Sequence, residues 1–219
     1  MASLKYKDLL ISALDVWIAS AYAYRINTQT YIPASGDWPK TAPGHKISNN
    51  KLVRKQLQSN LKDCSARDRS IGLQAMTWCK QTMMMKSLKG NLNDFDTKLV
   101  HACTMEEFNY HTDALYWTII PCQLRPFASE RASNDMLTDV EIDRNPIAEV
   151  KKRIGLKIII IKEFYSQNWG TWYYTAITST NHMVRFPNKQ QYSIGSHHSV
   201  QATIAEYIDK EYITKLNRV

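Results

Sequence analysis

The chain has 219 residues, of which 44% are hydrophobic and 22% are charged, and its formal net charge is +8. This length suits one large or two small domains, and the composition is that of a globular protein. The surplus of Lys and Arg favours polyanionic partners. No stretch approaches about 18 consecutive apolar residues, so we expect neither a membrane span nor a membrane partner. A signal peptide is also absent from the first residues, and we therefore expect a cytoplasmic protein.

The sequence lacks the short motifs that carry catalysis or bind a metal. Cysteines stand at positions 64, 79, 103 and 122, and none forms the close pair that is typical of zinc sites. Neither a Walker-type phosphate loop nor an H-E-x-x-H or G-x-S-x-G motif is present. We therefore expect free thiols, no metal, no cofactor and no catalytic activity. A metal-dependent nuclease built from scattered carboxylates is the alternative.

Two helices are predicted in the N-terminal part of the chain. Apolar residues recur at three- and four-residue steps over residues 3–24, which is typical of an amphipathic helix. Residues 27–50 are interrupted by Pro and Gly and predict a long loop, a feature of functional or partly disordered segments. Ser48 is the expected N-cap of the second helix, which extends to residue 61. This is the most basic predicted helix, and it carries Lys51, Arg54, Lys55 and Lys62.

Three further helices are predicted before residue 121. The segment 66–88 contains a run of three methionines, which suits an irregular core or an adaptable protein interface. Residues 92–103 and 104–120 predict two more helices, because Thr104 followed by acids resembles an N-cap. Pro121 is expected to end the last of these helices.

Residues 121–145 are richer in Pro, Ser, Asn and Asp, and this composition predicts a linker. We place a helical domain at 1–140, a linker and entry segment at 141–153, and a barrel at 154–219. The acids of the linker could cover a basic groove until a ligand displaces them. A solvated linker without that role is the alternative.

The last part of the chain predicts five short strands. Runs rich in β-branched and aromatic residues occupy positions 157–164, 169–178, 183–186, 199–204 and 212–219, with polar, turn-like breaks between them. Five short strands at this spacing favour a small closed or half-closed barrel.

The second of these runs carries aromatic residues on both faces, because side chains of a strand alternate between its two sides. Trp172 and Tyr174 fall on one face, and Tyr173 and Thr175 fall on the other. One set can fill the barrel while the other lies near the surface. A surface ring can stack on an unpaired base, which is worth roughly 1–3 kcal/mol per base. In the alternative interpretation, all of these rings belong to the core.

The predicted barrel also carries much of the positive charge. From residue 146 to residue 219 there are ten Lys or Arg against five Asp or Glu, a net charge of +5. Basic groups near exposed aromatic rings are typical of a groove for single-stranded nucleic acid. An ordinary solvated basic surface would have the same composition.

This segment resembles the oligonucleotide/oligosaccharide-binding (OB) module of phage replication and single-stranded DNA-binding proteins. The resemblance covers about residues 154–219 and is carried by G-L-K at 155–157, W-G-T-W-Y at 169–173, N-H-M-V-R-F at 181–186, Gly195, A-T-I at 202–204 and T-K-L-N-R-V at 214–219. Two features differ from the family pattern. Asn181 replaces the usual turn glycine and would have to adopt the left-handed conformation. Ala205 or Glu206 replaces an expected lysine, which removes one basic contact.

The predicted helices and strands indicate the α+β fold class, with a helical N-terminal domain followed by a small five-stranded β-barrel. The resemblance implies that this barrel is OB-like. It also implies a non-catalytic protein that binds single-stranded DNA or RNA, an accessory factor of phage DNA replication or recombination in the host cytoplasm. Replication proteins would be further partners. The alternative is an interaction module that docks or inhibits a host or replisome protein. The expected nucleic-acid-binding residues are Lys157, Lys162, Trp169, Trp172, Tyr174, Arg185, Phe186, Lys215 and Arg218.

Overall fold

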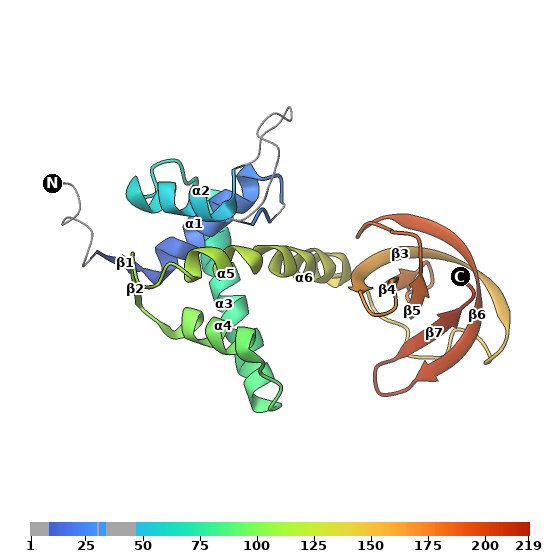
Figure 1. Ribbon diagram of the computed structural model, residues 1–219. Coiled ribbons are helices and arrows are strands. Elements are labelled where there is room, and N and C mark those ends of the chain that lie inside the picture. Colours follow the sequence, from blue (N-terminus) through green and yellow to red (C-terminus); the bar gives the residue numbers. More distant parts are fainter. Residues whose placement is uncertain (1–8, 30, 34–46) are drawn as a thin grey trace. The chain divides into compact units, whose positions relative to one another are not determined.

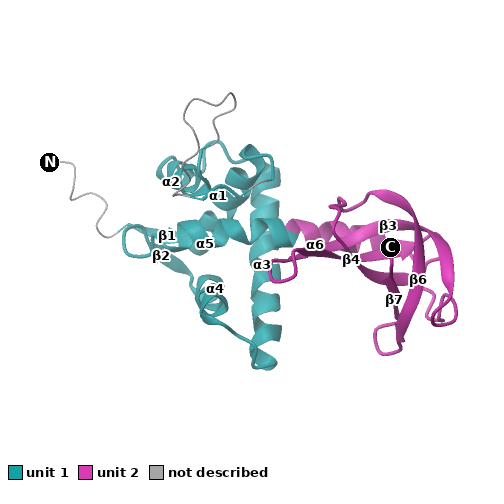
Figure 2. Cartoon of the chain, turned by 45° about the vertical axis from the view of Figure 1, so that its right-hand side comes forward, with its two compact units in different colours: residues 1–127 teal, residues 128–219 magenta. Residues whose placement is uncertain are grey.

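The computed structural model describes residues 9–29, 31–33 and 47–219 (Figure 1). The chain divides into two compact units, Met1–Phe127 and Ala128–Val219 (Figure 2). The first unit is mainly helical, and the second contains a closed five-stranded β-barrel. These features confirm the predicted α+β fold class. The domain bounds at 1–140, 141–153 and 154–219 stay a prediction.

The first unit is organised around a buried helix, α1 (Ala13–Ile26), which packs against α2, α3 and α5. The other helices of this unit are α2 (Asn49–Gln58), α3 (Ala66–Leu88), α4 (Asp94–Thr104) and α5 (Tyr116–Cys122). Two short strands, β1 (Leu10–Ser12) and β2 (Glu107–Asn109), form an antiparallel pair.

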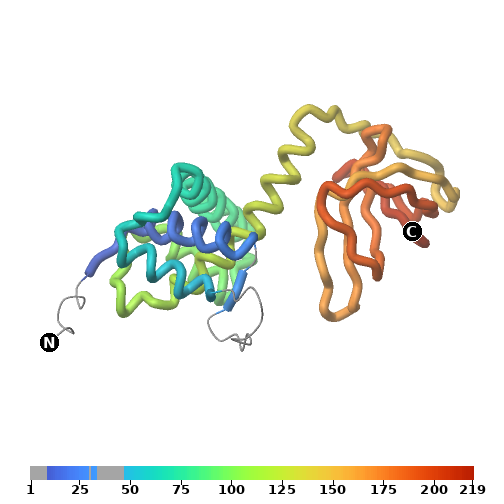
Figure 3. Tube along the Cα trace, turned by 90° about the horizontal axis from the view of Figure 1, so that it is seen from above, coloured from blue at the N-terminus to red at the C-terminus, as the bar shows by residue number. Residues whose placement is uncertain are grey.

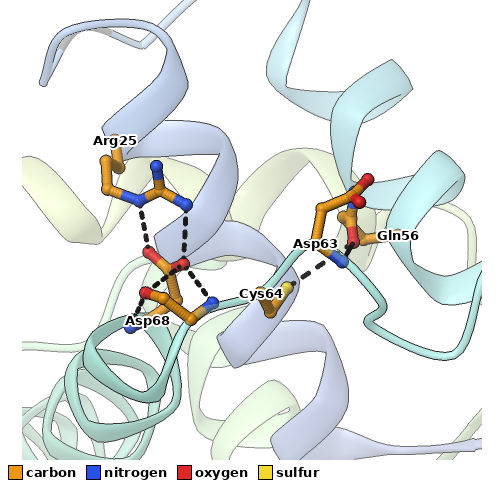
Figure 4. Close-up of polar contacts among 6 residues, drawn as sticks. Arg25, Gln56, Asp63, Cys64 and Asp68 are labelled. Atoms are coloured by element: carbon orange, nitrogen blue, oxygen red, sulfur yellow. Dashed lines mark hydrogen bonds and ion pairs between the residues drawn. The ribbon is translucent and has the colours of Figure 1, made fainter.

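A half-buried ion pair links α1 to the start of α3. The Arg25 guanidinium donates to both carboxylate oxygens of Asp68 at 2.8 Å, and Asp68 is 1% exposed (Figure 4). Asp68 also accepts from the backbone N–H of Ser65 in a capping box at the N-terminus of α3. Burial raises the pKa of Asp68, but the hydrogen bonds from Arg25 and Ser65 outweigh burial and lower it below its ordinary value. The carboxylate is therefore charged and paired where the two helices meet.

The sequence predicts the starts of α2 and α3 correctly, but it places the start of α1 too early. Ser48 caps α2 as expected, since its hydroxyl accepts from the backbone N–H of Lys51 at 3.4 Å. The predicted helix at 3–24 begins only at Ala13, because the three residues before it pair with β2, and residues 1–8 lie outside the described part. Residue 30 and residues 34–46 of the predicted loop also lie outside it.

The helix predicted at 104–120 is wrong over residues 105–115 and is confirmed over residues 116–120, which belong to α5. Thr104 is the last residue of α4 rather than an N-cap, and its hydroxyl donates back to the Val100 carbonyl at 3.0 Å. The chain then enters β2, which is held by pairing with β1, and α5 begins only at Tyr116. Pro121 lies inside α5 instead of ending the helix before it.

The linker predicted at 121–145 is wrong over most of its length. Residues 124–137 form helix α6 (Leu124–Leu137), within which the chain passes from the first unit to the second (Figure 3). Ser133 is a fully buried polar residue of this helix, and its hydroxyl donates to the Ile161 carbonyl oxygen at 2.7 Å. A surface-like sequence therefore forms a helix that contacts β3 through the hydroxyl of Ser133.

The barrel contains β3 (Arg153–Ser166), β4 (Thr171–Thr178), β5 (Met183–Asn188), β6 (His197–Ile208) and β7 (Ile213–Asn217). The strands close in the order β3-β4-β5-β7-β6, in which β5 and β7 are parallel and the other pairs are antiparallel. The first half of β3 pairs with β6 and the second half with β4. This closed barrel is compatible with an OB-like fold. Asn181 is left-handed at φ 61°, as the sequence predicts.

Inward side chains of all five strands form the barrel core. Tyr174 lies at its centre with 0% exposure, and burial raises the pKa of its phenol. Its hydroxyl donates to the Gln190 carbonyl at 3.0 Å and accepts from the Tyr192 backbone N–H at 2.9 Å. The tyrosine therefore fastens the loop between β5 and β6 to the core.

The contact between α1 and α3 generates a first prediction. A Cβ atom on Gly72 would lie 2.7 Å from the backbone Cα and N of Ile18, and backbone cannot move aside as a side chain can. Gly72→Ala should therefore lower the free energy of unfolding by about 1–3 kcal/mol, although alanine favours a helix over glycine. Denaturant unfolding measures this. Ser87→Ala, at an exposed site of the same helix, is the control, and an unchanged midpoint for Gly72→Ala would contradict the packing.

Candidate nucleic-acid interface

The outer surface of β3, β4, β5 and β7 carries two adjoining rows of side chains. Residues paired across neighbouring strands lie on the same face of a sheet. The first row is Phe164, Tyr173 and Pro187. The second row is Lys162, Thr175, Arg185 and Lys215. We call the surface formed by Lys162, Phe164, Tyr173, Thr175, Arg185 and Lys215 the aromatic–basic face.

A β-bulge in β3 creates this arrangement. Ile160 pairs with Ala176, whereas Lys162 pairs with Thr175, so Ile161 is one extra residue in β3. Side chains alternate along a strand, and an extra residue exchanges the two faces beyond it. Ile160 therefore points into the core, and Lys162 two positions later points outwards.

The aromatic row is open to solvent. Phe164 is 65% exposed and Tyr173 is 37% exposed. At the turn that joins the same two strands, Trp169 is 77% exposed. Gly170 follows it in the left-handed conformation at φ 55°, which glycine adopts without steric cost. Three rings on one hairpin are therefore available to a ligand.

The structure reverses the expected roles of the two faces of β4. Tyr174 and Phe186 are both 0% exposed and lie in the barrel core, so their assignment as nucleic-acid contacts is wrong. Trp172 is half-buried on the same side, 4.9 Å from the ring of Tyr165. The outward residue of β4 is Tyr173, which was not among the expected contacts. A sequence signal was present, because Arg185 and Phe186 are neighbours and cannot both face outwards.

The other expected contacts divide into two groups. Lys162, Arg185 and Lys215 come together on the aromatic–basic face. Lys157 lies apart from it, where β3 pairs with β6, beside a hollow of about 350 Å³ that His197 and Ser199 also line. Arg218 follows the end of β7 and belongs to neither row.

Acidic side chains accompany two of the three cations of the face. The Arg185 Nη2 atom lies 3.2 Å from a Glu211 carboxylate oxygen, and the Lys215 Nζ atom lies 2.8 Å from Glu206. Within the described part of the chain, Lys162 has no such ion pair. A second bulge, between Ile204 and Glu206, brings Glu206 opposite Lys215.

The acids of the predicted linker do not cover these cations. The Asp143 carboxylate instead accepts from the backbone N–H of Asn145 at 2.9 Å and lies 3.4 Å from the His182 ring. The Asn145 N–H lowers the pKa of Asp143, and His182 adds to this effect. This carboxylate therefore stabilises the turn before β3.

No family model, curated protein or solved structure matches this chain. The helices that the structure describes include none that is both long and apolar enough to cross a bilayer. Over the same residues, no group of three or more His, Cys, Asp or Glu side chains is arranged to hold a metal ion. What the fold defines is a helical unit joined to a closed five-stranded barrel of OB-like type.

The opposite placement of two adjacent tyrosines can be tested by stability. Tyr174→Ala should lower the free energy of unfolding of the barrel by about 3–5 kcal/mol, because it empties a core position. Tyr173→Ala should change that free energy by less than about 1 kcal/mol, because its ring is outside the core. Denaturant unfolding of the two variants compares them directly, and equal losses would contradict the orientation of β4.

Proposed function

We propose that this protein binds single-stranded nucleic acid on the aromatic–basic face of its barrel. The observation that carries the proposal is the alignment of the exposed rings of Phe164 and Tyr173 with the row of Lys162, Arg185 and Lys215. Successive bases stack on exposed rings while cations follow the phosphates. Duplex DNA keeps its bases stacked internally, so the rings favour single strands.

The position of the face within the barrel also supports this proposal. β4 and β5 are the second and third strands of the barrel, and Trp169 lies in the loop between the first and second strands. OB barrels bind oligonucleotides on the face of strands 2 and 3 and through the loop between strands 1 and 2. The wider role that we propose is a non-catalytic accessory factor of phage DNA replication or recombination, as the resemblance implies.

Glu206 and Glu211 moderate this binding. In the free protein they neutralise Lys215 and Arg185, so a phosphate has to displace a carboxylate at each position. Such exposed ion pairs are weak, and displacement is therefore feasible at modest salt. Stacking then contributes a larger share of affinity than it would on a fully basic surface.

A protein-docking module is the second candidate. Near the C-terminal end of α3, Met84, Met85 and Leu88 are each more than half exposed. Methionine-rich surfaces adapt to several partners. Salt distinguishes the two functions, because nucleic-acid binding weakens steeply as salt rises and an apolar interface does not.

Removal of the aromatic row tests the proposed function. Phe164→Ala combined with Tyr173→Ala should weaken binding of an oligothymidine strand by at least tenfold, given roughly 1–3 kcal/mol for each stacked base. Fluorescence anisotropy at two salt concentrations measures the affinity, and log K should fall with log salt with a slope near −2 if about three cations contact phosphates. Phe95→Ala, at an exposed ring of α4, is the matched control. Unchanged affinity in the double variant would show that the aromatic–basic face is not the binding site.

Removal of the two acids should act in the opposite direction. Glu206→Gln combined with Glu211→Gln frees Lys215 and Arg185 while keeping side chains of similar size. The affinity for the same strand should rise by about threefold to tenfold at low salt, and the salt slope should steepen because more phosphates are neutralised. The same anisotropy titration measures both quantities. A fall in affinity would show that the acids support the face rather than compete for it.

A further inference from the structure

A cavity of about 880 Å³ adjoins one end of the aromatic–basic face. Its walls come from the segment before β3, the turn between β4 and β5, and the loop between β6 and β7. The segment is held in place because the Asp143 backbone N–H donates to the Asn181 carbonyl at 3.0 Å and the Tyr207 hydroxyl donates to the Arg144 carbonyl. Glu211 lines the cavity and also contacts Arg185, so the cavity continues from the face. Its volume lies within the range of small-molecule sites, and it is open to solvent.

One wall residue has a conformation that stability alone does not favour. Tyr212 is left-handed at φ 54°, a position where glycine or asparagine fits and a bulky residue is strained. Its ring is 43% exposed, and the Arg144 guanidinium carbon lies 5.1 Å from the ring centroid. Leu61, Lys151 and Arg218 are left-handed too, so the case for a site rests on the exposed ring and its contact with Arg144 rather than on the strain.

The polar groups of the cavity indicate which hydrogen-bonding groups the ligand carries. Three carboxylates line it, and two are engaged: Glu211 by Arg185, and Asp143 by Asn145 and His182. Among the described residues, Glu141 has no hydrogen bond or ion pair. A free carboxylate accepts two parallel N–H bonds. The cavity therefore combines a stacking surface with an acceptor for two adjacent donors.

We propose that this cavity binds a guanine base of the single strand. The base stacks on the Arg144–Tyr212 pair, and the Glu141 carboxylate accepts from the N1–H and N2–H donors of its Watson–Crick edge. Thymine has one N–H on that edge, between two carbonyl oxygens that a carboxylate repels. An arginine side chain of a protein partner also has two such donors; the continuity of the cavity with the aromatic–basic face favours a base of the bound strand instead.

This inference rests on the proposed function, and the experiment separates the two. Anisotropy titrations of the full chain compare a labelled all-thymine strand with the same strand carrying one central guanine. The guanine strand should bind about tenfold more tightly, as expected for one bidentate contact. Glu141→Gln should abolish the preference without weakening binding of the all-thymine strand. Glu149→Gln, an exposed acid that does not line the cavity, should keep the preference.

A second variant shows whether a loss of the guanine preference comes from the binding site or from a folding defect. Tyr212→Gly removes the stacking ring and also relieves the left-handed strain, so it should lose the guanine preference without lowering the Tm. If the two strands bind equally, or if the preference survives Glu141→Gln, the assignment of the cavity to guanine is rejected. The proposed binding of single strands on the aromatic–basic face is unaffected by either result. Binding of neither strand overturns both. Capture of an arginine-rich peptide that depends on Glu141, without any guanine preference, overturns the nucleobase assignment in favour of a protein ligand.

Discussion

The outer face of the barrel depends on one extra residue in β3. If the alternation continued unbroken from the inward-facing Ile160, Lys162 and Phe164 would also point into the core, and a cation would be buried among apolar side chains. The bulge at Ile161 exchanges the two sides and sends both residues outwards. Ile161 is itself fully buried, and its carbonyl oxygen meets the hydroxyl of Ser133 in α6. Helix α6 therefore supports the irregularity on which the candidate site depends.

A second bulge, in β6, adds negative charge to the same face. It brings Glu206 outwards opposite Lys215. The first bulge thus adds a ring and a cation, and the second adds an acid beside a cation. The result is a face rich in ring surface whose positive charge is partly neutralised. Under the proposed function, stacking on the rings would therefore contribute more to binding than charge does, which would limit non-specific binding to duplexes.

The left-handed turn positions of the barrel differ in how well their residue types tolerate that conformation. Gly170 and Asn181 are left-handed, and both residue types accept that conformation readily. Tyr212 has the same conformation without that tolerance, and its ring lies against Arg144 at the wall of a cavity. Lys151 and Arg218 of the same unit are also left-handed, so the conformation of Tyr212 does not by itself mark a ligand site. What sets Tyr212 apart is the contact of its ring with Arg144 at the wall of the cavity.

The sequence alone determined the features that neighbouring residues dictate: the extent of α3, the cap at Ser48, the five strands and the left-handed Asn181. Each depends on contacts within a few positions along the chain. Only the tertiary structure decided the rest. β2 replaced part of a predicted helix because it pairs with a distant strand. Polar α6 replaced a linker, and its contact with β3 through Ser133 joins residues that are far apart in the sequence. The choice of Tyr173 over Tyr174 as the outer ring was likewise tertiary, because alternation separates the two residues but only barrel closure decides which side becomes the core.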